Sequence, residues 1–387
     1  MTEPLDLGAA AAGAYEVLDR HWQSELGYCP PNPDVYPSQW AWDSGFHSIA
    51  WAGHDPERGM TEMRSLFEGM LSNGFLPHMR YAAPSEVNRG PLTDRSSFVQ
   101  PPVFGIALAR LAEAGVRDRQ VEEQGAAALR WLFAERHVDG LVMVVHPWET
   151  GCDDSPRWDS YAGVDHWDYD ALVALDRASV VAARYSPVGA AVASSLLEVR
   201  SAGFNAICAR SAIELGTLSG DQDLVAEGRQ LADEIDDQMW SEGDRCWVDL
   251  GTLDTPAARV PTLDSLLPMM VTSNHDRREQ IIDRLLDPDE YSAPFGSRFL
   301  PKRHRLYRPD IYWRGVSWPS LDYLLWSSLS AVNPEAANDL ARRVVRGAVD
   351  SAYAEYWNPD DASSMGAAPQ TWTAIVGPMA QSLIDEN

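Results

Sequence analysis

The residues best suited to chemistry lie between His146 and Asp159, a stretch with four carboxylates, two Trp and one Arg. Pro147, Gly151 and Pro156 disfavour a long helix or a central strand here, so the sequence predicts a loop. Carboxyl groups beside flat aromatic rings suit glycoside hydrolysis, because one acid must protonate the leaving oxygen while the rings hold the sugar. An acidic surface loop with buried indole rings accounts for the same composition, so this stretch alone leaves both interpretations open.

Glycoside hydrolysis also needs a carboxylate that stays ionised and activates water. Glu355 is the candidate, because it is predicted in the last turn of an apolar helix just before a loop. The helix dipole disfavours a negative charge there, and a residue placed against local preference indicates function. The alternative is an ordinary solvent-exposed Glu. An acid at Asp153 would need a pKa raised by burial or by a neighbouring charge, which Glu149, Asp154 or Asp159 could supply.

Three further segments place polar side chains near aromatic ones. Asp43 closely follows Trp40 and Trp42, so it could accept hydrogen bonds from sugar hydroxyls or cap the helix that follows. His78 is either a satisfied structural histidine or a substrate ligand. Gln100 is either a loop-to-helix cap or an amide donor to the substrate.

A fourth segment, residues 312–319, combines a Tyr, two Trp, an Arg and a Gly just before an apolar helix. Gly315 would let the backbone approach a ligand closely, since it has no side chain. An aromatic helix entry packed in the core is the alternative for this segment.

The 387-residue chain has 45% hydrophobic and 23% charged residues, as in a soluble globular protein, and a formal net charge of -26. This acidity argues against nucleic acid and anionic membrane surfaces as partners, since both bind basic patches. The 15 Trp outnumber the 13 Tyr and the 9 Phe, and a carbohydrate site lined with indole rings would use part of this excess. A small carbohydrate is therefore the expected partner, while the oligomeric state stays open.

The sequence indicates no cofactor and no metal site. The four Cys form no CxxC pair and no zinc spacing, no HExxH occurs, and the nine His are scattered. No run of 18 apolar residues predicts a membrane span, and the acidic start of the sequence is unlike a signal peptide. A cytoplasmic protein with reduced thiols is the expectation.

Hydrophobic periodicity predicts an all-α protein of about a dozen helices. Helices are expected over 8–26, 42–54, 57–72, 99–115, 118–137, 204–216, 224–239, 263–286, 315–331 and 370–385. Gly216 suits the end of the sixth of these. Another helix is expected after Asn333, its N-cap, with Pro334 at its first position. Loops are expected over 73–98, 287–312 and 357–369, and a short strand or hairpin over 242–250. No linker or repeat divides the chain, so 1–387 is expected to be a single domain. A closed toroid of paired helices accounts for this count, and an open bundle is the alternative.

Four motifs together resemble glycoside hydrolase family 63, and more narrowly its bacterial mannosylglycerate and glucosylglycerate hydrolases. They are Tyr-Pro-Ser-Gln-Trp-Ala-Trp-Asp-Ser at 36–44, His-Pro-Trp-Glu-Thr-Gly-Cys-Asp at 146–153, Tyr-Trp-Arg-Gly-Val-Ser-Trp at 312–318 and Glu-Tyr-Trp-Asn-Pro at 355–359. The motifs keep their order and rough spacing from residue 36 to 372, so the resemblance covers nearly the whole chain.

The resemblance implies an (α/α)6 barrel and an inverting α-glycosidase that acts on a small α-glucoside or α-mannoside, such as glucosylglycerate or mannosylglycerate. By motif position, Asp153 is the general acid and Glu355 is the base. The positions that match sugar-binding residues of relatives are Trp42, Asp43, Gln100, Trp148, Gly151, Trp313, Gly315 and Trp318. Gln370 and Arg184 fall near the positions that contact the glycerate carboxylate. Tyr36, Trp40, His78 and Tyr312, from the same segments, complete the candidate substrate ligands.

Some residues depart from the family pattern. Thr150 replaces the usual Ser, Cys152 replaces a larger apolar residue, and Val316 replaces Pro. Asp154 stands where Asn is common, so it competes with Asp153 for the acid role. The loops between motifs are short, so the hydrolytic core is better supported than the glycerate preference. An α-glucosidase or trehalase-like enzyme on di- or oligosaccharides is the main alternative; a sugar epimerase and a non-catalytic sugar-binding protein are others.

Overall fold

The computed structural model describes residues 4–83, 90–253 and 258–385, which are mostly helical, as predicted. The α-helices are α1 (Leu7–His21), α2 (Ala41–Ala52), α3 (Pro56–Glu68), α4 (Phe104–Glu113), α5 (Arg119–Glu135), α6 (Asp159–Ala162), α7 (Tyr169–Ala182), α8 (Ala202–Ser219), α9 (Gln222–Met239), α10 (His275–Leu286), α11 (Pro319–Val332), α12 (Pro334–Asp350) and α13 (Val376–Asp385). Short 3-10 helices are η1 (Pro147–Thr150), η2 (Pro156–Trp158), η3 (Leu263–Met270) and η4 (Thr371–Ile375).

Short strands form antiparallel pairs between the helices. The pairs are β1 (Gln39–Trp40) with β2 (Met79–Arg80), β3 (His137–Val138) with β4 (Leu141–Val142), β5 (Ala183–Tyr185) with β6 (Ala191–Ser194), β7 (Val199–Arg200) with β10 (Leu250–Gly251), β8 (Trp240–Ser241) with β9 (Cys246–Trp247), β11 (Ser292–Ala293) with β12 (Gly296–Ser297), and β13 (Tyr356–Trp357) with β14 (Ser364–Met365). The hairpin of β8 and β9 confirms the strand prediction near 242–250. Residues 84–89 of the predicted loop 73–98 lie outside the described ranges.

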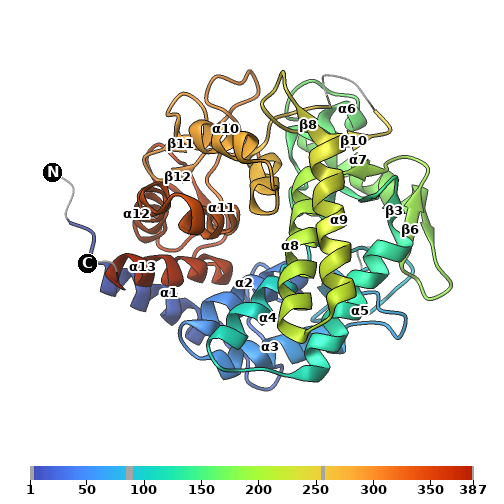
Figure 1. The fold of residues 1–387 in the computed structure, drawn as a ribbon, viewed down its shortest axis with the longest axis horizontal. Helices are drawn as coiled ribbons and strands as arrows, with labels where there is room; N and C mark the ends of the chain where they lie inside the picture. The colour runs from blue at the N-terminus through green and yellow to red at the C-terminus, as the bar shows by residue number, and fades with distance from the viewer. Residues whose placement is uncertain (1–3, 84–89, 254–257, 386–387) are drawn as a thin grey trace.

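One set of helices packs as a ring. α2 contacts α4, α4 contacts α8, α8 contacts η3, η3 contacts α11, and η4 contacts both α11 and α2. A second set packs on the first: α3 on α2, α9 on α8, α10 on η3 and α12 on α11. α1 and α13 lie side by side near the two ends of the chain (Figure 1). We call α2, α4, α8, η3, α11 and η4 the inner helices, because α2, for example, is buried from Ala41 to Trp51.

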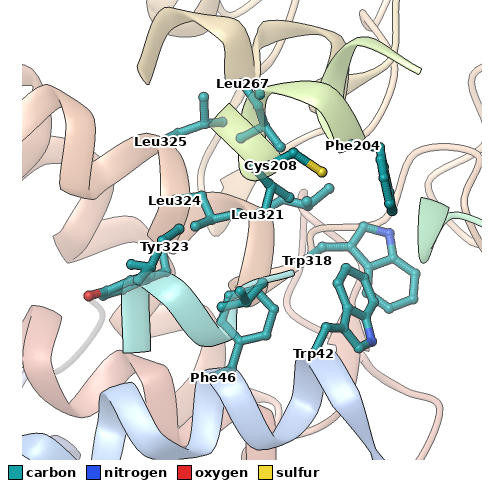
Figure 2. Close-up of a cluster of buried hydrophobic side chains, with 14 of the residues drawn as sticks. Trp42, Phe46, Phe204, Cys208, Leu267, Trp318, Leu321, Tyr323, Leu324 and Leu325 are labelled. Atoms are coloured by element: carbon teal, nitrogen blue, oxygen red, sulfur yellow. The ribbon is translucent and has the colours of Figure 1, made fainter. Parts of the chain in front are cut away.

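Apolar side chains from different inner helices meet inside the ring. Figure 2 shows Trp42 and Phe46 of α2, Phe204 and Cys208 of α8, Leu267 of η3, and Trp318, Leu321, Leu324 and Leu325 at the start of α11. Burying a large apolar side chain stabilises a fold by roughly 1.5–3 kcal/mol. The same contiguous core extends from Ala10 to Leu383 along the chain. Within the described ranges, no helix combines the length and apolar composition that crossing a membrane requires.

Helix starts follow the capping signals in the sequence. The Asp55 side chain accepts a hydrogen bond from the backbone N–H of Arg58, and Pro56 takes the first helical position of α3. Asn333 and Pro334 begin α12 in the same way, as predicted. α4 begins only at Phe104, later than predicted, because Pro101 and Pro102 precede it in non-helical conformation.

Two of the helix ends that differ from the prediction affect the packing or the site. α8 continues past Gly216 and ends before Gly220, which adopts a left-handed φ of 79°. Gly216 instead allows α9 to pack closely, since a Cβ there would lie 2.8 Å from Val225 Cγ2. α12 ends at Asp350, so Glu355 is not in its last turn and the helix-dipole argument does not apply. Positive φ angles at Ala352 and Tyr353 turn the chain away from the helix axis before Glu355.

Gly216→Ala should destabilise the protein by about 1–2 kcal/mol. A Cβ there would lie 2.9 Å from the backbone O of Asp221 and the backbone N of Val225, so overpacking should cost about 2–3 kcal/mol, while the better helix propensity of Ala returns about 1 kcal/mol. Gly243→Ala is the control, since nothing lies within 4 Å of a Cβ built there. Urea denaturation of both variants measures the difference. Equal stability of the two variants would contradict the close packing of α8 on α9.

Candidate active site

A cavity of about 740 Å³ opens where several inner helices begin. Its wall includes the predicted residues Tyr36, Trp40, Trp42, Asp43, Gln100, Trp148, Gly151, Asp153, Tyr312, Glu355 and Gln370. These side chains come from the start of α2, from the segments before α4, α11 and η4, from the loop around η1 and from the segment before β13. Residues more than 300 positions apart in sequence are therefore brought together at one end of the ring.

The loop that carries Asp153 is fixed from inside the core by Glu149, whose side chain is fully buried. Its carboxylate accepts hydrogen bonds from both terminal nitrogens of the buried Arg136, at 2.6 and 2.9 Å. It also accepts hydrogen bonds from the backbone N–H groups of Val99 (3.1 Å) and Val145 (2.6 Å). A charge buried in this way needs full pairing to be tolerated, so the position of the loop is strongly constrained.

Gly151 is required in this loop for two reasons. Its φ of 76° is left-handed, a conformation that favours glycine. A Cβ at this position would lie 2.5 Å from Cη2 of the Trp42 ring. The backbone therefore lies against an indole that also lines the cavity, just two residues before Asp153.

Asp153 has the environment of a protonated acid. Its Oδ1 accepts hydrogen bonds from Nε1 of Trp313 (3.0 Å) and from the hydroxyl of Tyr312 (3.4 Å). Burial raises the pKa of Asp153 well above its usual value, and the negative charges of Asp154 and Asp176 raise this pKa further. Since both donors contact Oδ1, a proton on the carboxyl belongs on Oδ2.

The donor Trp313 is itself held rigidly. Its ring stacks on Trp318 with centroids 3.6 Å apart and an angle of 13° between the planes. Between them in sequence, Arg314 forms a buried bidentate ion pair with Asp159, at 2.6 and 2.7 Å. This pair joins the segment before α11 to the end of the loop over residues 146–159, here called the acid loop. Both partners of the Trp313–Asp153 hydrogen bond are therefore fixed.

Glu355 is buried beside the same cavity. Its Oε2 accepts hydrogen bonds from the hydroxyl of Tyr36 (3.4 Å) and the backbone N–H of Ala367 (3.0 Å). Burial raises the pKa of Glu355 to about 7, and the charge of Asp43 also raises it, while the two hydrogen bonds lower it. Because these two donors share Oε2, Oε1 is the oxygen available for a water molecule.

Asp43, Gln100 and Gln370 form a polar edge of the cavity. Asp43 is the third residue of α2 rather than its N-cap, and burial raises its pKa to about 6. Gln370 forms a hydrogen bond with Asp43 and accepts another from the backbone N–H of Trp372, so it caps η4. Gln100 accepts a hydrogen bond from the backbone N–H of Trp42 at 3.2 Å, so it does not cap α4, the helix that follows it.

Other predicted ligands lie outside the cavity wall: His78, Arg184, Trp313, Gly315 and Trp318. Trp313 and Trp318 are fully buried and support Asp153. A Cβ on Gly315 would lie 2.7 Å from the carbonyl oxygen of Arg308, so its close approach is to the protein's own backbone. His78 is buried between the rings of Trp40 and Trp148. Arg184 is exposed on β5.

One wall of the cavity, formed by α7, was not predicted from the sequence. Asp176 on this helix accepts a hydrogen bond from Nε1 of Trp148 at 3.1 Å. Arg177, one residue further on, also lines the cavity. The signal that could have revealed α7 is its N-cap, Asp168, which precedes the apolar residues Leu172 and Leu175. In the structure Asp168 accepts a hydrogen bond from the backbone N–H of Ala171, and both Leu side chains are buried.

Comparison with known proteins identifies the family. Residues 36–373 match the mannosylglycerate hydrolase MGH1-like glycoside hydrolase domain. The chain belongs to this glycoside hydrolase family. It is therefore a glycoside hydrolase, and the resemblance seen in the sequence motifs is confirmed. Among the described residues of this glycoside hydrolase, no group of three or more His, Cys, Asp or Glu side chains is arranged to hold a metal ion.

Individual relatives of this glycoside hydrolase cover most of its length. A glucosylglycerate hydrolase of Mycolicibacterium hassiacum is 28% identical, with 88% of this chain and 91% of the relative aligned. A mannosylglycerate hydrolase of Rubrobacter radiotolerans is also 28% identical, over 94% and 95% of the two chains. The crystal structure of the family 63 mannosylglycerate hydrolase from Thermus thermophilus, in complex with Tris and D-glycerate, shares the fold with a TM-score of 0.80, at 23% identity over 96% of this chain and all of the other.

Glu149→Gln should destabilise the glycoside hydrolase by about 3–5 kcal/mol, because it leaves the buried Arg136 guanidinium without its counter-charge. Glu123→Gln is the matched control, since Glu123 pairs with Arg119 on the surface and such pairs contribute about 0–1 kcal/mol. Urea denaturation compares the two variants. A Glu149→Gln variant as stable as the control would contradict the role of this ion pair in fixing the loop.

Proposed function

We propose that the protein is an inverting α-glycosidase that hydrolyses α-glucosides or α-mannosides of a small hydroxy acid such as glycerate. The observation that carries the proposal is the pair formed by Asp153 and Glu355. Both carboxyl groups line one cavity, and the hydrogen bonds from Trp313 and Ala367 each go to one oxygen of the carboxyl that they contact, which leaves the other oxygen for substrate or water. The named relatives, which hydrolyse glucosylglycerate and mannosylglycerate, support the choice of substrate class.

In the proposed reaction, Asp153 is the general acid and Glu355 is the general base. Oδ2 of Asp153 donates its proton to the glycosidic oxygen while the bond from this oxygen to the anomeric carbon breaks. Oε1 of Glu355 takes a proton from a water molecule, whose oxygen forms the new bond to the anomeric carbon from the opposite face. The products are a sugar of inverted configuration and the free hydroxy acid. Asp153 is preferred to Asp154 because its pKa is raised the more strongly of the two.

The polar edge of the cavity is suited to the hydroxyl groups of the sugar. Asp43 and Gln370 hold each other by a hydrogen bond, so they can present a fixed set of donors and acceptors. We assign Trp42 and Trp148 as ring contacts for the sugar, because both line the cavity next to this edge. Tyr36, Trp40, Gln100, Gly151 and Tyr312 complete this part of the wall.

For the carboxylate of the hydroxy acid we propose Arg177 in place of Arg184. A guanidinium pairs well with a carboxylate, and Arg177 lines the cavity whereas Arg184 does not. Arg177 lies on α7 next to Asp176, whose carboxylate contributes to the raised pKa of Asp153. An acidic aglycone would thus be held close to the general acid.

We further propose that the two sets of helices form an (α/α)6 barrel and that residues 1–387 are one domain. The ring of contacts through the inner helices and the second set packed on it support the barrel. The contiguous core from Ala10 to Leu383 supports a single domain. The beginnings of the inner helices α2, α4, α11 and η4 would then share the end of the barrel where the active site lies.

Asp153→Asn and Glu355→Gln should each lower kcat for glucosylglycerate or mannosylglycerate by about 100-fold or more, because general acid–base catalysis contributes about 10²–10⁴-fold. Circular dichroism should show that both variants keep the wild-type helix content. The assay measures glycerate release over time. Wild-type turnover by either variant would refute the role assigned to that residue.

The proposed roles predict a bell-shaped dependence of kcat/KM on pH. Glu355 must be ionised, so activity is lost as the pH falls through its pKa of about 7. Asp153 must be protonated, so activity is lost as the pH rises through its raised pKa. Asp154→Asn removes a negative charge that raises the pKa of Asp153, and should therefore move the alkaline limb to lower pH. An alkaline limb that stays in place would contradict the assignment of Asp153 as the acid.

Arg177→Met should lower the ratio of kcat/KM for glucosylglycerate to kcat/KM for α-glucosyl fluoride by about 10-fold or more. The glycerate carboxylate loses its partner in this variant, whereas the fluoride substrate has no carboxylate and should be unaffected. Mannosylglycerate and α-mannosyl fluoride form the corresponding pair if the sugar is mannose. Arg184→Met is the matched control and should leave the ratio unchanged. If Arg184→Met lowers the ratio and Arg177→Met does not, Arg184 rather than Arg177 is the carboxylate ligand.

A further inference from the structure

Two aromatic side chains stand exposed on the cavity wall. Trp167 is 38% exposed and Tyr169 is 57% exposed, although large aromatic residues are usually buried. Both line the cavity, and their ring centroids are 6.4 Å apart. Neither residue belongs to the motifs that resemble the family, and neither has a part in the chemistry of Asp153 and Glu355. Exposed apolar rings in a cavity indicate a binding surface.

The ring of Trp167 is held in place by the residue next to the proposed acid. The indole N–H of Trp167 forms a hydrogen bond with the carboxylate of Asp154. Exposed tryptophan rings that are fixed in this way offer a rigid flat face, because the side chain loses little freedom when a ligand binds. The sequence has Asp at position 154 and Trp at 167, so this contact joins the acid loop to the segment just before α7.

The charged neighbours of the two proposed catalytic residues differ. Asp43 and Gln370, which are assigned to the sugar, are linked to Glu355, since the charge of Asp43 raises the pKa of Glu355. The charged groups that act on Asp153 are instead Asp154 and, on α7, Asp176. The general acid stands between the sugar and its leaving group, so Asp154, Trp167 and α7 border the leaving group.

The wall formed by α7 is longer than a three-carbon acid needs. Tyr169, Val173, Arg177 and Val180 all line the cavity and recur at the spacing of one helix face. At a rise of 1.5 Å per residue, the eleven steps from Tyr169 to Val180 extend about 16 Å along the cavity. Glycerate beside Arg177 would occupy only part of this length.

We propose that Trp167, held by Asp154, forms a subsite for a pyranose ring in the leaving group, so that the enzyme also hydrolyses α-linked disaccharides. This inference rests on the proposed glycosidase function and extends its substrate class. The face of an indole attracts the polarised C–H bonds of a sugar ring. Asp154, Asp176 and Arg177 line the same cavity and offer charged partners for hydroxyl groups, which favours a sugar over a purely apolar ring.

The reaction is the one already described, with a second sugar as the leaving group. Asp153 gives its proton to the glycosidic oxygen, which leaves as a hydroxyl group of the second sugar. Glu355 takes a proton from the water that bonds to the anomeric carbon. One disaccharide and one water therefore yield two monosaccharides, and no further reactant is needed.

The test compares kcat/KM for three kinds of substrate: the α-fluorides of glucose and mannose, glucosylglycerate and mannosylglycerate, and a panel of α-linked glucose and mannose disaccharides. Wild-type enzyme should hydrolyse at least one disaccharide. Trp167→Ala should lower the ratio of kcat/KM for this disaccharide to that for the fluoride by about tenfold or more. Trp167→Phe should restore only part of the ratio, because Phe keeps a flat ring but has no N–H for Asp154 to hold. Val181→Ala is the control, because Val181 is an exposed residue of α7 that does not line the cavity.

The outcomes separate the two proposals. Hydrolysis of a fluoride or a glycosylglycerate without hydrolysis of any disaccharide would overturn the pyranose subsite and leave the glycosidase proposal standing. An unchanged ratio in Trp167→Ala would also overturn the subsite. If no substrate of any kind is hydrolysed, the glycosidase proposal fails, and the subsite inference fails with it.

Discussion

The buried ion pair between Glu149 and Arg136 is the interaction on which the rest of the site depends. Two charges at zero exposure stabilise little by themselves, because removing them from water costs nearly as much as their attraction returns. The ion pair matters because it fixes the position of the loop that carries Asp153. Glu149 also binds two backbone N–H groups from different segments, so the loop between Val145 and Asp153 can satisfy these donors only in one arrangement.

A second buried pair, between Arg314 and Asp159, extends this constraint to the opposite side of the acid. The stacked rings of Trp313 and Trp318 then bring an indole N–H to one oxygen of Asp153. The base is fixed more simply, by Tyr36 and by the backbone of Ala367. The site is thus rigid where proton transfer is proposed, while α7 presents a wall with partly exposed side chains. Fixed carboxyl groups beside so long a wall would allow one chemistry to serve leaving groups of different size.

The sequence predicted the helical fold and much of the cavity wall, because Trp-rich motifs with polar residues mark segments where loops meet inner helices. The departure at Thr150 has a physical explanation, since its hydroxyl accepts a hydrogen bond from the backbone N–H of Cys152, as a Ser hydroxyl could. The roles of Trp313 and Trp318 could not be predicted, because an indole that supports an acid and one that touches a sugar have the same sequence signal. α7 was missed because its cavity face mixes Tyr, Val and Arg, which weakens the amphipathic pattern.

In the proposed mechanism, Asp153 and Glu355 act as acid and base in a single displacement by water. The configuration of the first sugar product distinguishes this mechanism from one with a covalent intermediate. Proton NMR can follow the anomeric signal while the enzyme acts on glucosylglycerate or mannosylglycerate. If Glu355 activates water, the β-anomer of the free sugar appears first and the α-anomer follows only by mutarotation. Initial release of the α-anomer would contradict the account, because retention requires a carboxylate that attacks the sugar rather than one that activates water.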